Sequence, residues 1–273
     1  MISIITINYN NLAGLKRTVE SVINQTWQEF EYIIIDGGST DGSAGYIESK
    51  LEHIDYWVSE PDNGIYNAMN KGIKKAAGEY LLFLNSGDIL DNEDALGHAV
   101  SQFDNSDLIV FDQKVVGDSV FYLTSPPSDI NFSYMYFGYL PHASTFIKKK
   151  LFNRAGLYDE NLRIVSDWKF MMVALFRYYC TYSKKAGVLS IFELGGFSSI
   201  YDDRFERNQV ISKYFGVYKQ DMDNLQQREL LLKQNRYKML QEIETRKFGK
   251  KIVSVFFRVY LFLIPKKNTE SIS

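Results

Sequence analysis

The chain has 273 residues, of which 45% are hydrophobic and 23% are charged, and its formal net charge is −2. This length and composition predict a globular protein with a full hydrophobic core, and the near-neutral charge argues against nucleic acid as a partner. A single cysteine, Cys180, excludes a disulfide framework and a cysteine-rich metal site. We expect a cytoplasmic protein, because this cysteine usage suits a reducing compartment and the N-terminal residues show no signal peptide.

The first half of the chain alternates strand and helix patterns. Short β-branched or apolar runs predict strands at Ile2–Asn8, Phe30–Asp36, Tyr56–Ser59 and Tyr80–Leu84. Between them, apolar residues recur at helical spacing, as in Ile65–Ala77, where Gly78 is expected to be the C′ residue. The alternation predicts an α/β fold, with a mostly parallel, mixed sheet and helices on both faces.

The second half is less regular, and we expect it to end in a helical extension. Further strands are predicted at Asp107–Phe111, Val120–Leu123 and Ser144–Ile147, the last two antiparallel. Asp167–Tyr179 has the pattern of an apolar helix, and Asp202–Arg246 is polar and helix-prone. We therefore predict one domain over 1–200, with halves 1–100 and 101–200, and a C-terminal helical extension over 201–273.

The tail contains an apolar segment, Ile252–Ile264, which is interrupted only by Ser254 and Arg258. Lysine pairs flank it on both sides, and it is too short to span a bilayer. Two interpretations remain open. Residues 250–267 could form a helix in the interface of an anionic membrane, which would place the protein at the inner face of the plasma membrane. Alternatively, they form a terminal helix that docks on the domain or on a partner subunit.

Several predicted strands end in polar residues. The segments are Thr6-Ile7-Asn8-Tyr9-Asn10, Asp36-Gly37-Gly38 and Asn85-Ser86-Gly87-Asp88. Parallel strands would gather these residues at one edge of the sheet, where α/β proteins bind ligands. Asp36 can only accept hydrogen bonds when ionised, which suits the N–H of a base or ribose hydroxyls. Turn formation or helix capping is the alternative role.

The helix near Gly64 carries a second polar group. Asn67, Asn70 and Lys71 stand at i, i+3 and i+4, so they share one face, and two amides with an ammonium suit a nucleotide or its phosphates. A solvated polar face is the alternative. Other nucleotide motifs are not met, because Gly37–Gly42 lacks the Lys-Ser/Thr of a phosphate loop and no Gly-x-Gly-x-x-Gly follows the first strand.

Taken in order, these motifs resemble the family 2 glycosyltransferases of GT-A fold. The matching segments are Ser3–Asn10, Ile35–Gly42, Asn67–Tyr80 and Leu84–Asp88. The resemblance is closest to bacterial enzymes that build capsule, O-antigen and exopolysaccharide. It is strong to about residue 90, looser to about residue 200, and absent beyond. It implies a GT-A fold, which is Rossmann-like.

The resemblance also implies roles for individual residues. A donor-binding role falls on Thr6, Asn8, Asp36, Asp62, Asn67, Asn70, Lys71, Ser86, Gly87 and His142. Among these, Asp36 would read the base. Asp88 matches the last Asp of the family's metal motif, which implies Mn2+ or Mg2+ as cofactor. Because Asn85 and Gly87 stand where relatives carry carboxylates, we expect the metal to arrive with the donor diphosphate.

Asp167 matches the family's catalytic carboxylate. The segment Gly156–Glu160, followed by Ser166-Asp167-Trp168, resembles the stretch around it. The resemblance implies that Asp167 is a general base that takes the proton of an acceptor hydroxyl, which would invert the anomeric configuration. The alternative is a carboxylate in the first turn of a helix, stabilised by the helix dipole.

The implied function is metal-dependent, inverting transfer of a hexosyl group from a nucleotide-sugar, most plausibly a UDP-sugar. The acceptor would be a saccharide, polyprenyl-linked, in surface polysaccharide synthesis. An inactive nucleotide- or glycan-binding module is one alternative, because the metal motif is reduced. A sugar-phosphate nucleotidyltransferase is another, but Ile2–Leu12 has none of the Gly, Lys or Arg that its phosphate loop needs.

Overall fold

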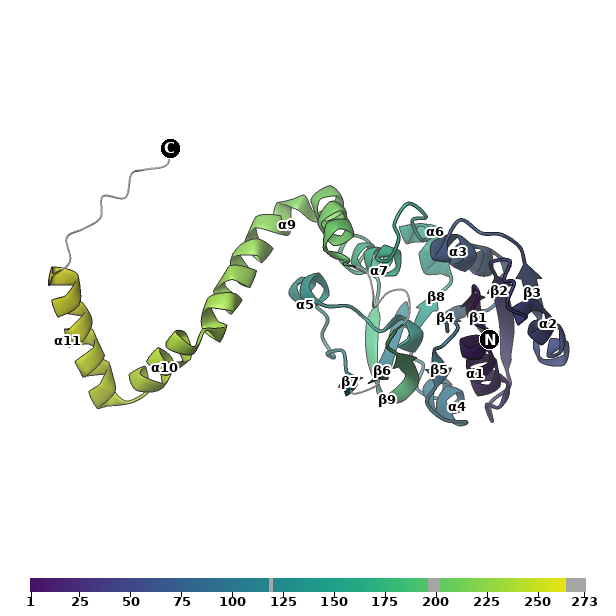
Figure 1. Cartoon of the computed structure of the whole chain (residues 1–273), viewed down its shortest axis with the longest axis horizontal. Coiled ribbons are helices and arrows are strands. Elements are labelled where there is room, and N and C mark those ends of the chain that lie inside the picture. Colours follow the sequence, from purple (N-terminus) through teal and green to yellow (C-terminus); the bar gives the residue numbers. More distant parts are fainter. Residues whose placement is uncertain (118–119, 196–201, 264–273) are drawn as a thin grey trace. The chain divides into compact units, whose positions relative to one another are not determined.

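The computed structural model describes residues 1–117, 120–195 and 202–263 (Figure 1). The chain divides into two compact units, Met1–Phe215 and Gly216–Ser273. The first unit therefore extends beyond the boundary that we expected at residue 200. The side chains of Val210, Ile211 and Phe215 are buried in its core, which explains the difference.

Nine strands of the described residues form one mixed sheet in the order β3-β2-β1-β4-β8-β6-β9-β5, with β7 paired to β6. The strands are β1 (Ile2–Asn8), β2 (Phe30–Asp36), β3 (Tyr56–Ser59), β4 (Tyr80–Phe83), β5 (Ile89–Leu90), β6 (Leu108–Gly117), β7 (Val120–Thr124), β8 (Thr145–Lys148) and β9 (Tyr182–Glu193). The first four strands are parallel, whereas β8 is antiparallel to β4 and β6, and β7 is antiparallel to β6. The antiparallel additions are as predicted, but β9 was not predicted.

Helices cover both faces of the sheet. They are α1 (Leu12–Ile23), α2 (Ser43–Glu48), α3 (Ile65–Lys75), α4 (Ala95–Val100), α5 (Phe132–Phe137), α6 (Lys150–Ala155) and α7 (Ser166–Phe176), with 3-10 turns η1 (Leu51–His53) and η2 (His142–Ser144). Ile5 of β1 packs in a core with Met69 of α3, whereas its neighbour Ile4 packs in a second core with Leu15 of α1. This alternation along the strand buries both faces, and the predicted α/β fold is confirmed.

The prediction that Gly78 is a helix C′ residue is wrong. The helix ends earlier, at Lys75, and its C-cap is Ala76. Gly78 instead lies against β1, where a Cβ atom would be 2.5 Å from the backbone nitrogen of Ser3. Its N–H donates to Ser3 Oγ at 2.8 Å. The absence of a side chain is therefore needed for close approach of two backbones.

We expect Gly78→Ala to lower the free energy of unfolding by roughly 1–3 kcal/mol, because backbone atoms cannot yield to the added methyl group. Gly45→Ala is the matched control, since nothing lies within 4 Å of a Cβ at this position inside α2. It should raise stability by about 0.5–1 kcal/mol through helix propensity. Urea denaturation of both variants measures the difference, and equal effects would contradict the packing argument.

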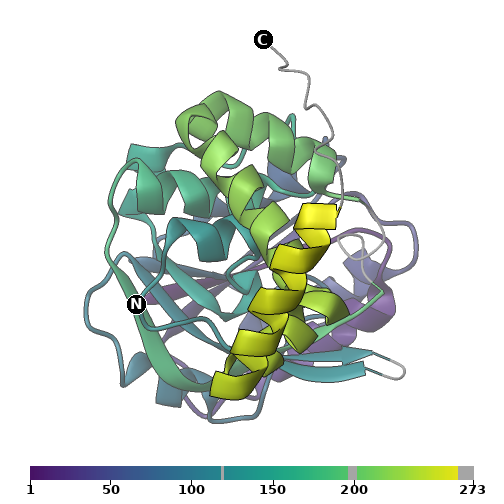
Figure 2. The same cartoon turned by 90° about the vertical axis from the view of Figure 1, so that its left-hand side faces the viewer.

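The second unit is helical, as predicted. It contains most of α9 (Arg204–Lys233), then α10 (Asn235–Glu244) and α11 (Lys247–Leu263). The α9 helix is broken at Phe215, which has φ −138° and ψ 24°, and the two units divide at this point. Helices α10 and α11 contact each other beside the turn that joins them (Figures 1 and 2). Within the described residues, no helix is both long enough and apolar enough to cross a membrane.

Candidate active site

A buried carboxylate, Asp36, organises the edge of the sheet where β1, β2 and β3 end. The parallel register places Asn8 beside Asp36 and Asp36 beside Ser59. The Asp36 carboxylate accepts hydrogen bonds from Asn8 Nδ2 at 2.7 Å, Ser39 Oγ at 2.6 Å, Ser39 N at 2.9 Å and Ser59 Oγ at 2.6 Å. Burial raises the pKa of Asp36, but these hydrogen bonds outweigh it, so the pKa lies below its ordinary value.

This network leaves its members little surface for a ligand, contrary to our expectation. Asp36 is 0% exposed, and its four donors fill the lone-pair sites of the carboxylate. Asn8 is also buried, and its Oδ1 accepts Ser86 Oγ at 2.8 Å. Thr6 points into the core, where its hydroxyl pairs with Tyr32 Oη at 3.1 Å. These residues therefore shape the edge of the sheet, and the direct nucleotide contacts predicted for Thr6, Asn8 and Asp36 gain no support.

Tyr9 and Asp62 lie over this network, packed against the buried Gly37. A Cβ atom at Gly37 would lie 2.5 Å from Asp62 Oδ2 and 3.2 Å from Tyr9 Cδ2, so both side chains meet above the glycine. Tyr9 is 66% exposed, and Asp62 Oδ1 accepts the Gly64 N–H at 2.9 Å. An exposed ring beside a carboxylate suits a nucleobase, which can stack on the one and donate to the other.

Sequence reasoning placed Asp62 in the donor site but missed Tyr9. The available signal was an aromatic residue between two asparagines, directly after a fully buried strand. The structure shows this ring to be 66% exposed, whereas the strand before it is buried.

The turn after β4 is fixed by hydrogen bonds to the N-terminal part of the chain. Gly87 has φ 114°, in the left-handed region that favours glycine. Its N–H donates to Thr18 Oγ1 at 3.0 Å, and that hydroxyl donates to the carbonyl of Asp88 at 2.8 Å. Asn11 Nδ2 donates to the carbonyl of Ser86 at 3.0 Å. Asp88 is thereby held in one position without a ligand.

The carboxylate of Asp88 is buried in surroundings that disfavour its ionised form. It is 7% exposed, and its Oδ2 accepts the Asn85 N–H at 3.2 Å. Burial raises its pKa to about 7; the Asn85 hydrogen bond opposes this, and the negative charge of Glu193 adds to it. A carboxylate in these surroundings is stabilised by a cation, so its chemistry fits a divalent ion.

A divalent ion at Asp88 would need further ligands from the nucleotide-sugar donor. In residues 1–117, 120–195 and 202–263, no group of three or more His, Cys, Asp or Glu side chains could hold an ion. Asp88 is the residue that would hold Mn2+ or Mg2+, with the diphosphate oxygens and water as the other ligands. That the metal arrives with the donor stays a prediction.

Asp167 lies in the first turn of α7 beside two buried tyrosines. Tyr66 of α3 donates its hydroxyl to Asp167 Oδ1 at 2.9 Å. Burial and the Asp167 carboxylate raise the pKa of Tyr66 well above its ordinary value, so the phenol keeps its proton and remains a donor. The ring of Tyr158 lies 5.7 Å from that of Tyr66. This hydrogen bond from α3 orients the carboxylate that we predicted to be the base.

His142 connects the Asp167 region with β4. Its Nε2 lies 2.9 Å from Tyr158 Oη, and its ring stacks on Phe83 with centroids 4.9 Å apart. Burial lowers the pKa of His142, although the Asp167 carboxylate opposes the effect. The imidazole is therefore neutral at pH 7. Phe83 ends β4 shortly before Asp88, so His142 links the Asp167 region to the strand that leads to Asp88.

The polar face of α3 is occupied by protein partners. Asn70 is 2% exposed; its Nδ2 donates to Glu160 Oε1 at 2.8 Å and to the carbonyl of Tyr158 at 2.9 Å, and its Oδ1 accepts the Tyr158 N–H at 3.0 Å. Asn67 Nδ2 donates to Glu160 Oε2 at 2.8 Å, and Lys71 pairs with Glu60 at 2.8 Å. Asn67 and Asn70 thus hold the segment that leads to Asp167, and nucleotide contacts by these residues or Lys71 remain predictions.

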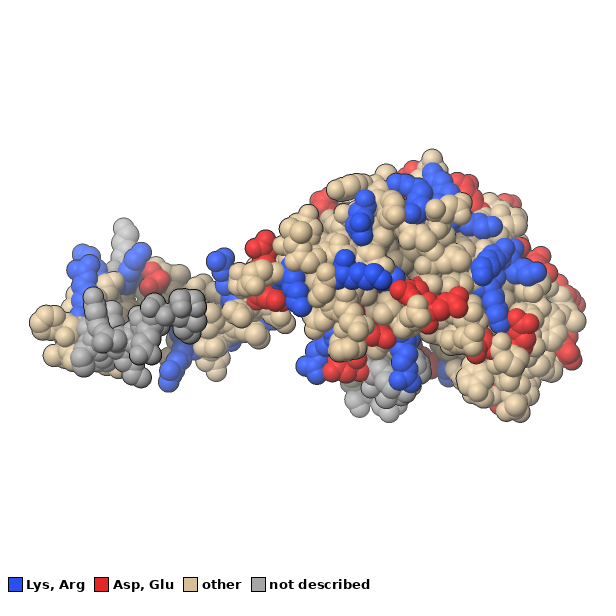
Figure 3. All heavy atoms as spheres, turned by 90° about the horizontal axis from the view of Figure 1, so that it is seen from above, with Lys and Arg blue, Asp and Glu red and all other residues tan. Residues whose placement is uncertain are grey.

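Basic and acidic side chains are interspersed over the face of the first unit that Figure 3 shows.

Glu160 was not among the predicted site residues. Hydrogen bonds from Asn70 and Asn67 hold its pKa below the ordinary value, so it stays ionised as an acceptor for both amides. Its role could not be read from the sequence because its partners lie on a distant helix.

Comparison with known proteins assigns this fold and site to a class. The model of the family described as glycosyl transferase family 2 matches residues 3–172. The chain therefore belongs to glycosyl transferase family 2, and it is a glycosyltransferase. An uncharacterized glycosyltransferase of Mycobacterium tuberculosis is 37% identical over 183 residues, which cover 63% of this chain and 68% of the relative. A PGL/p-HBAD biosynthesis glycosyltransferase of Mycobacterium bovis is 29% identical over 225 residues, covering 80% and 87% of the two chains.

Solved structures confirm the GT-A fold. Residues 1–349 of Staphylococcus aureus TarS, in complex with UDP-GlcNAc, align with a TM-score of 0.63 and 21% identity, covering 77% of this chain and 64% of that one. The mannosyltransferase PcManGT of Pyrobaculum calidifontis, in complex with GDP-Man and Mn2+, aligns with a TM-score of 0.55 and 15% identity, covering 70% and 56%. A longer TarS chain is covered to 43% of its length.

Proposed function

We propose that this glycosyltransferase transfers a hexosyl group from a UDP-sugar to a polyprenyl-linked saccharide, with inversion, in bacterial surface polysaccharide synthesis. The observation that carries the proposal is a pair of carboxylates held in two different environments. Asp88 is buried with a raised pKa and needs a cation, whereas Asp167 accepts the Tyr66 hydroxyl and its charge acts on His142. A diphosphate leaving group and a hydroxyl acceptor require these two different environments.

The donor base is proposed to bind at Tyr9 and Asp62. The ring of Tyr9 supplies a stacking surface, and Asp62 Oδ2, which lies over Gly37 because that residue has no side chain, can accept the imide N–H of uracil. The buried network of Asn8 and Asp36 fixes the strand ends on which this surface rests. In this proposal, Asp62 takes the base-reading role that the sequence suggested for Asp36.

The chemical step follows from the position of Asp167. Its carboxylate removes the proton of an acceptor hydroxyl as that oxygen attacks the anomeric carbon from the face opposite the diphosphate. Tyr66 keeps the carboxylate oriented, because its phenol remains protonated. When bound at Asp88, Mn2+ or Mg2+ neutralises charge on the departing diphosphate. A displacement with this geometry inverts the configuration.

The acceptor part of the proposal has support from relatives alone. The mycobacterial relatives include a PGL/p-HBAD biosynthesis enzyme, and the UDP-GlcNAc complex of TarS has a similar fold. The donor and the cofactor are inferred from the site, which offers a ring and a carboxylate to a base at Tyr9 and Asp62 and a buried carboxylate to a cation at Asp88.

Release of UDP from UDP-sugars tests the proposal. The full chain is incubated with single UDP-sugars and with Mn2+ or EDTA, and nucleoside diphosphate is measured with and without an undecaprenyl-linked acceptor. We expect acceptor- and Mn2+-dependent release, and a product of inverted anomeric configuration by NMR. A chain that binds UDP-sugars but never releases UDP would be a binding module, and a retained configuration would exclude Asp167 as base.

Tyr9→Ala is expected to weaken UDP binding roughly tenfold, because base–aromatic stacking contributes about 1–3 kcal/mol. Tyr178→Ala is the matched control, since Tyr178 is also an exposed tyrosine but lies after α7, away from the strand ends. Isothermal titration calorimetry with UDP and Mn2+ measures both variants. Equal affinities for the two variants and the native chain would remove Tyr9 from the donor site.

A further inference from the structure

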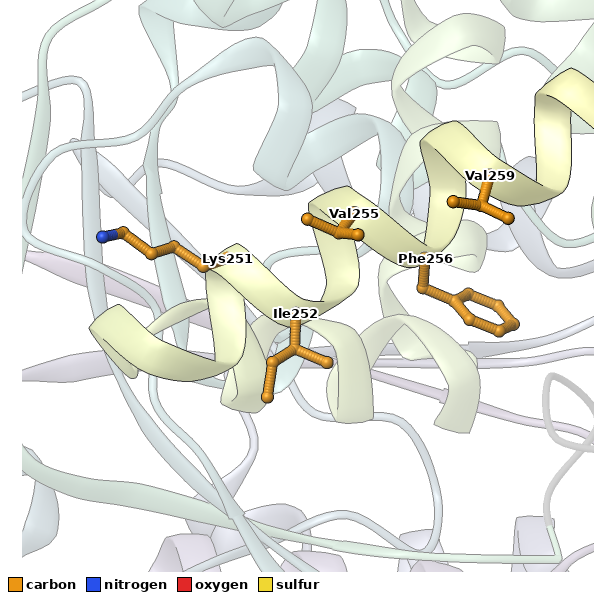
Figure 4. A pocket seen from close by; sticks show the side chains of 5 residues that line it. All are labelled: Lys251, Ile252, Val255, Phe256 and Val259. Carbon is orange, nitrogen blue, oxygen red and sulfur yellow. The ribbon is translucent and has the colours of Figure 1, made fainter.

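Within the second unit, the helix α11 leaves a continuous apolar face uncovered. Its residues lie on successive turns and are between 53% and 89% exposed: Ile252, Val255, Phe256, Val259, Phe262 and Leu263. Figure 4 shows four of them, together with Lys251, where they line a shallow groove on the helix. An apolar stripe that stays this exposed across several turns is unusual for a helix surrounded only by water.

The other face of α11 is cationic. Lys250 and Arg258 lie on it with Ser254, Lys251 stands at its border with the apolar face, and the sequence has no Asp or Glu between 247 and 263. A helix face that rests on another soluble protein surface is normally bordered by charges of both signs. A border made only of Lys and Arg complements a surface of one sign, and that sign is negative.

We propose that α11 docks in the surface of an anionic lipid bilayer, with its apolar face among the acyl chains and its basic residues at the head groups. The helix cannot span the bilayer, but its amphipathic pattern suits a position in the plane of the interface. Its aromatic rings fit that depth, since Phe256 and Tyr260 stack with centroids 6.1 Å apart on the exposed side. This inference does not depend on the proposed function.

Flotation of the full chain with vesicles tests the proposal. One vesicle preparation contains phosphatidylcholine alone, and the other contains phosphatidylcholine with phosphatidylglycerol. We expect the chain to float with the anionic vesicles and to bind the neutral ones far more weakly, and added salt should weaken the anionic binding. Equal binding to both preparations, or no flotation with the anionic one, would overturn the proposal.

A variant without the basic residues separates the contribution of charge to vesicle binding from the contribution of apolar contact. The triple variant Lys250→Gln, Lys251→Gln, Arg258→Gln should bind anionic vesicles on the order of a hundredfold more weakly, because each basic residue near such a surface contributes roughly fivefold. Binding to neutral vesicles should not change. Native-like anionic binding by this variant would contradict the assigned role of the border.

A matched control changes the net charge equally outside α11. Lys233→Gln, Arg236→Gln and Lys238→Gln remove three exposed basic residues from the end of α9 and from α10. This variant should retain most of the anionic binding. If it loses as much as the α11 variant, overall charge rather than the α11 face attracts the chain, and the proposal fails.

Removing the apolar face distinguishes a bilayer from a second copy of the chain. Phe256→Ser, Val259→Ser and Phe262→Ser should abolish flotation without changing the oligomeric state measured by light scattering. If the native chain is instead a dimer that this variant dissociates, and it does not float, the face is an interface between copies and the proposal is wrong. Unchanged helical circular dichroism and UDP-induced thermal shift confirm that each variant is folded.

Discussion

Asp88→Asn is expected to abolish sugar transfer and at the same time to stabilise the fold above pH 7. Burial raises the pKa of Asp88 from its ordinary value of 3.8 to about 7, so the folded chain holds a proton there that the unfolded chain has lost. The stability linked to this proton is fully present below about pH 4 and is lost as the pH rises through 7. At pH 8.5 the charged carboxylate therefore costs roughly 3–4 kcal/mol, which the neutral amide avoids.

The measurement is urea denaturation at pH 8.5 and at lower pH, without metal or donor. The gain for Asp88→Asn should shrink as the pH falls from 7 toward 4. Asp129→Asn is the control, since it removes the same charge from an exposed position and should change stability little. A destabilised Asp88→Asn at pH 8.5 would contradict the electrostatic account, and full turnover would remove Asp88 from the site.

The same pKa makes cation binding depend on pH. Because a divalent ion binds the ionised carboxylate, its affinity in the presence of UDP should fall about tenfold for each pH step below 7 and level off above it. The UDP-dependent thermal shift with Mn2+ reports this, and Asp88→Asn should lose both the shift and its pH dependence. EDTA should stop transfer by the native chain, and added Mn2+ should restore it.

Asp167→Asn is expected to lower the rate of transfer by a factor on the order of 10²–10⁴, the usual contribution of a general base. The amide can still accept the Tyr66 hydroxyl, which lies 2.9 Å from Oδ1 in the native chain, so the local structure should remain. Turnover with saturating donor and acceptor measures the loss, and UDP affinity should be unchanged. Retained native turnover would show that another group accepts the proton.

Tyr66→Phe provides the comparison for Asp167→Asn. It removes only the hydrogen bond that orients the carboxylate, so we expect a smaller loss of turnover, on the order of tenfold. Turnover at saturating donor and acceptor separates the two roles, since Tyr66→Phe should retain more activity than Asp167→Asn while both keep the native affinity for UDP. Native turnover by Tyr66→Phe would reduce Tyr66 to a packing residue.

The elements of the first half could be predicted because their signals are local. The strands Ile2–Asn8, Phe30–Asp36 and Tyr56–Ser59 are apolar runs bounded by polar turns, and the structure has the same limits. Tyr182–Glu193 was missed, since its lysines and Gly187 interrupt the apolar pattern. That strand exists because it pairs with β6, a partner far away in the sequence. Pairing of this kind overrides local preference.

The roles of the site residues could not be predicted from the sequence, because they depend on which side chains pack above the strand ends. The sequence shows a carboxylate at Asp36, but not that Asn8 and Ser59, from other strands, complete its hydrogen bonds. Alternation along β1 turns Thr6 toward Tyr32, although the sequence places it among the ligand-binding candidates. Tyr9 is visible as a residue, but its position over Gly37 follows only from the fold.

The buried amide of Asn8 has a consequence for changing the donor preference of this enzyme. Because Asn8 bonds both Asp36 and Ser86, substitutions within that network should be strongly non-additive and should damage the whole strand edge. Tyr9 and Asp62 pack over Gly37, and their side chains take no part in the hydrogen bonds of this network. Substitutions at Tyr9 and Asp62 can therefore change the nucleotide preference, while the hydrogen bonds of Asn8, Asp36 and Ser86 keep the strand ends in place.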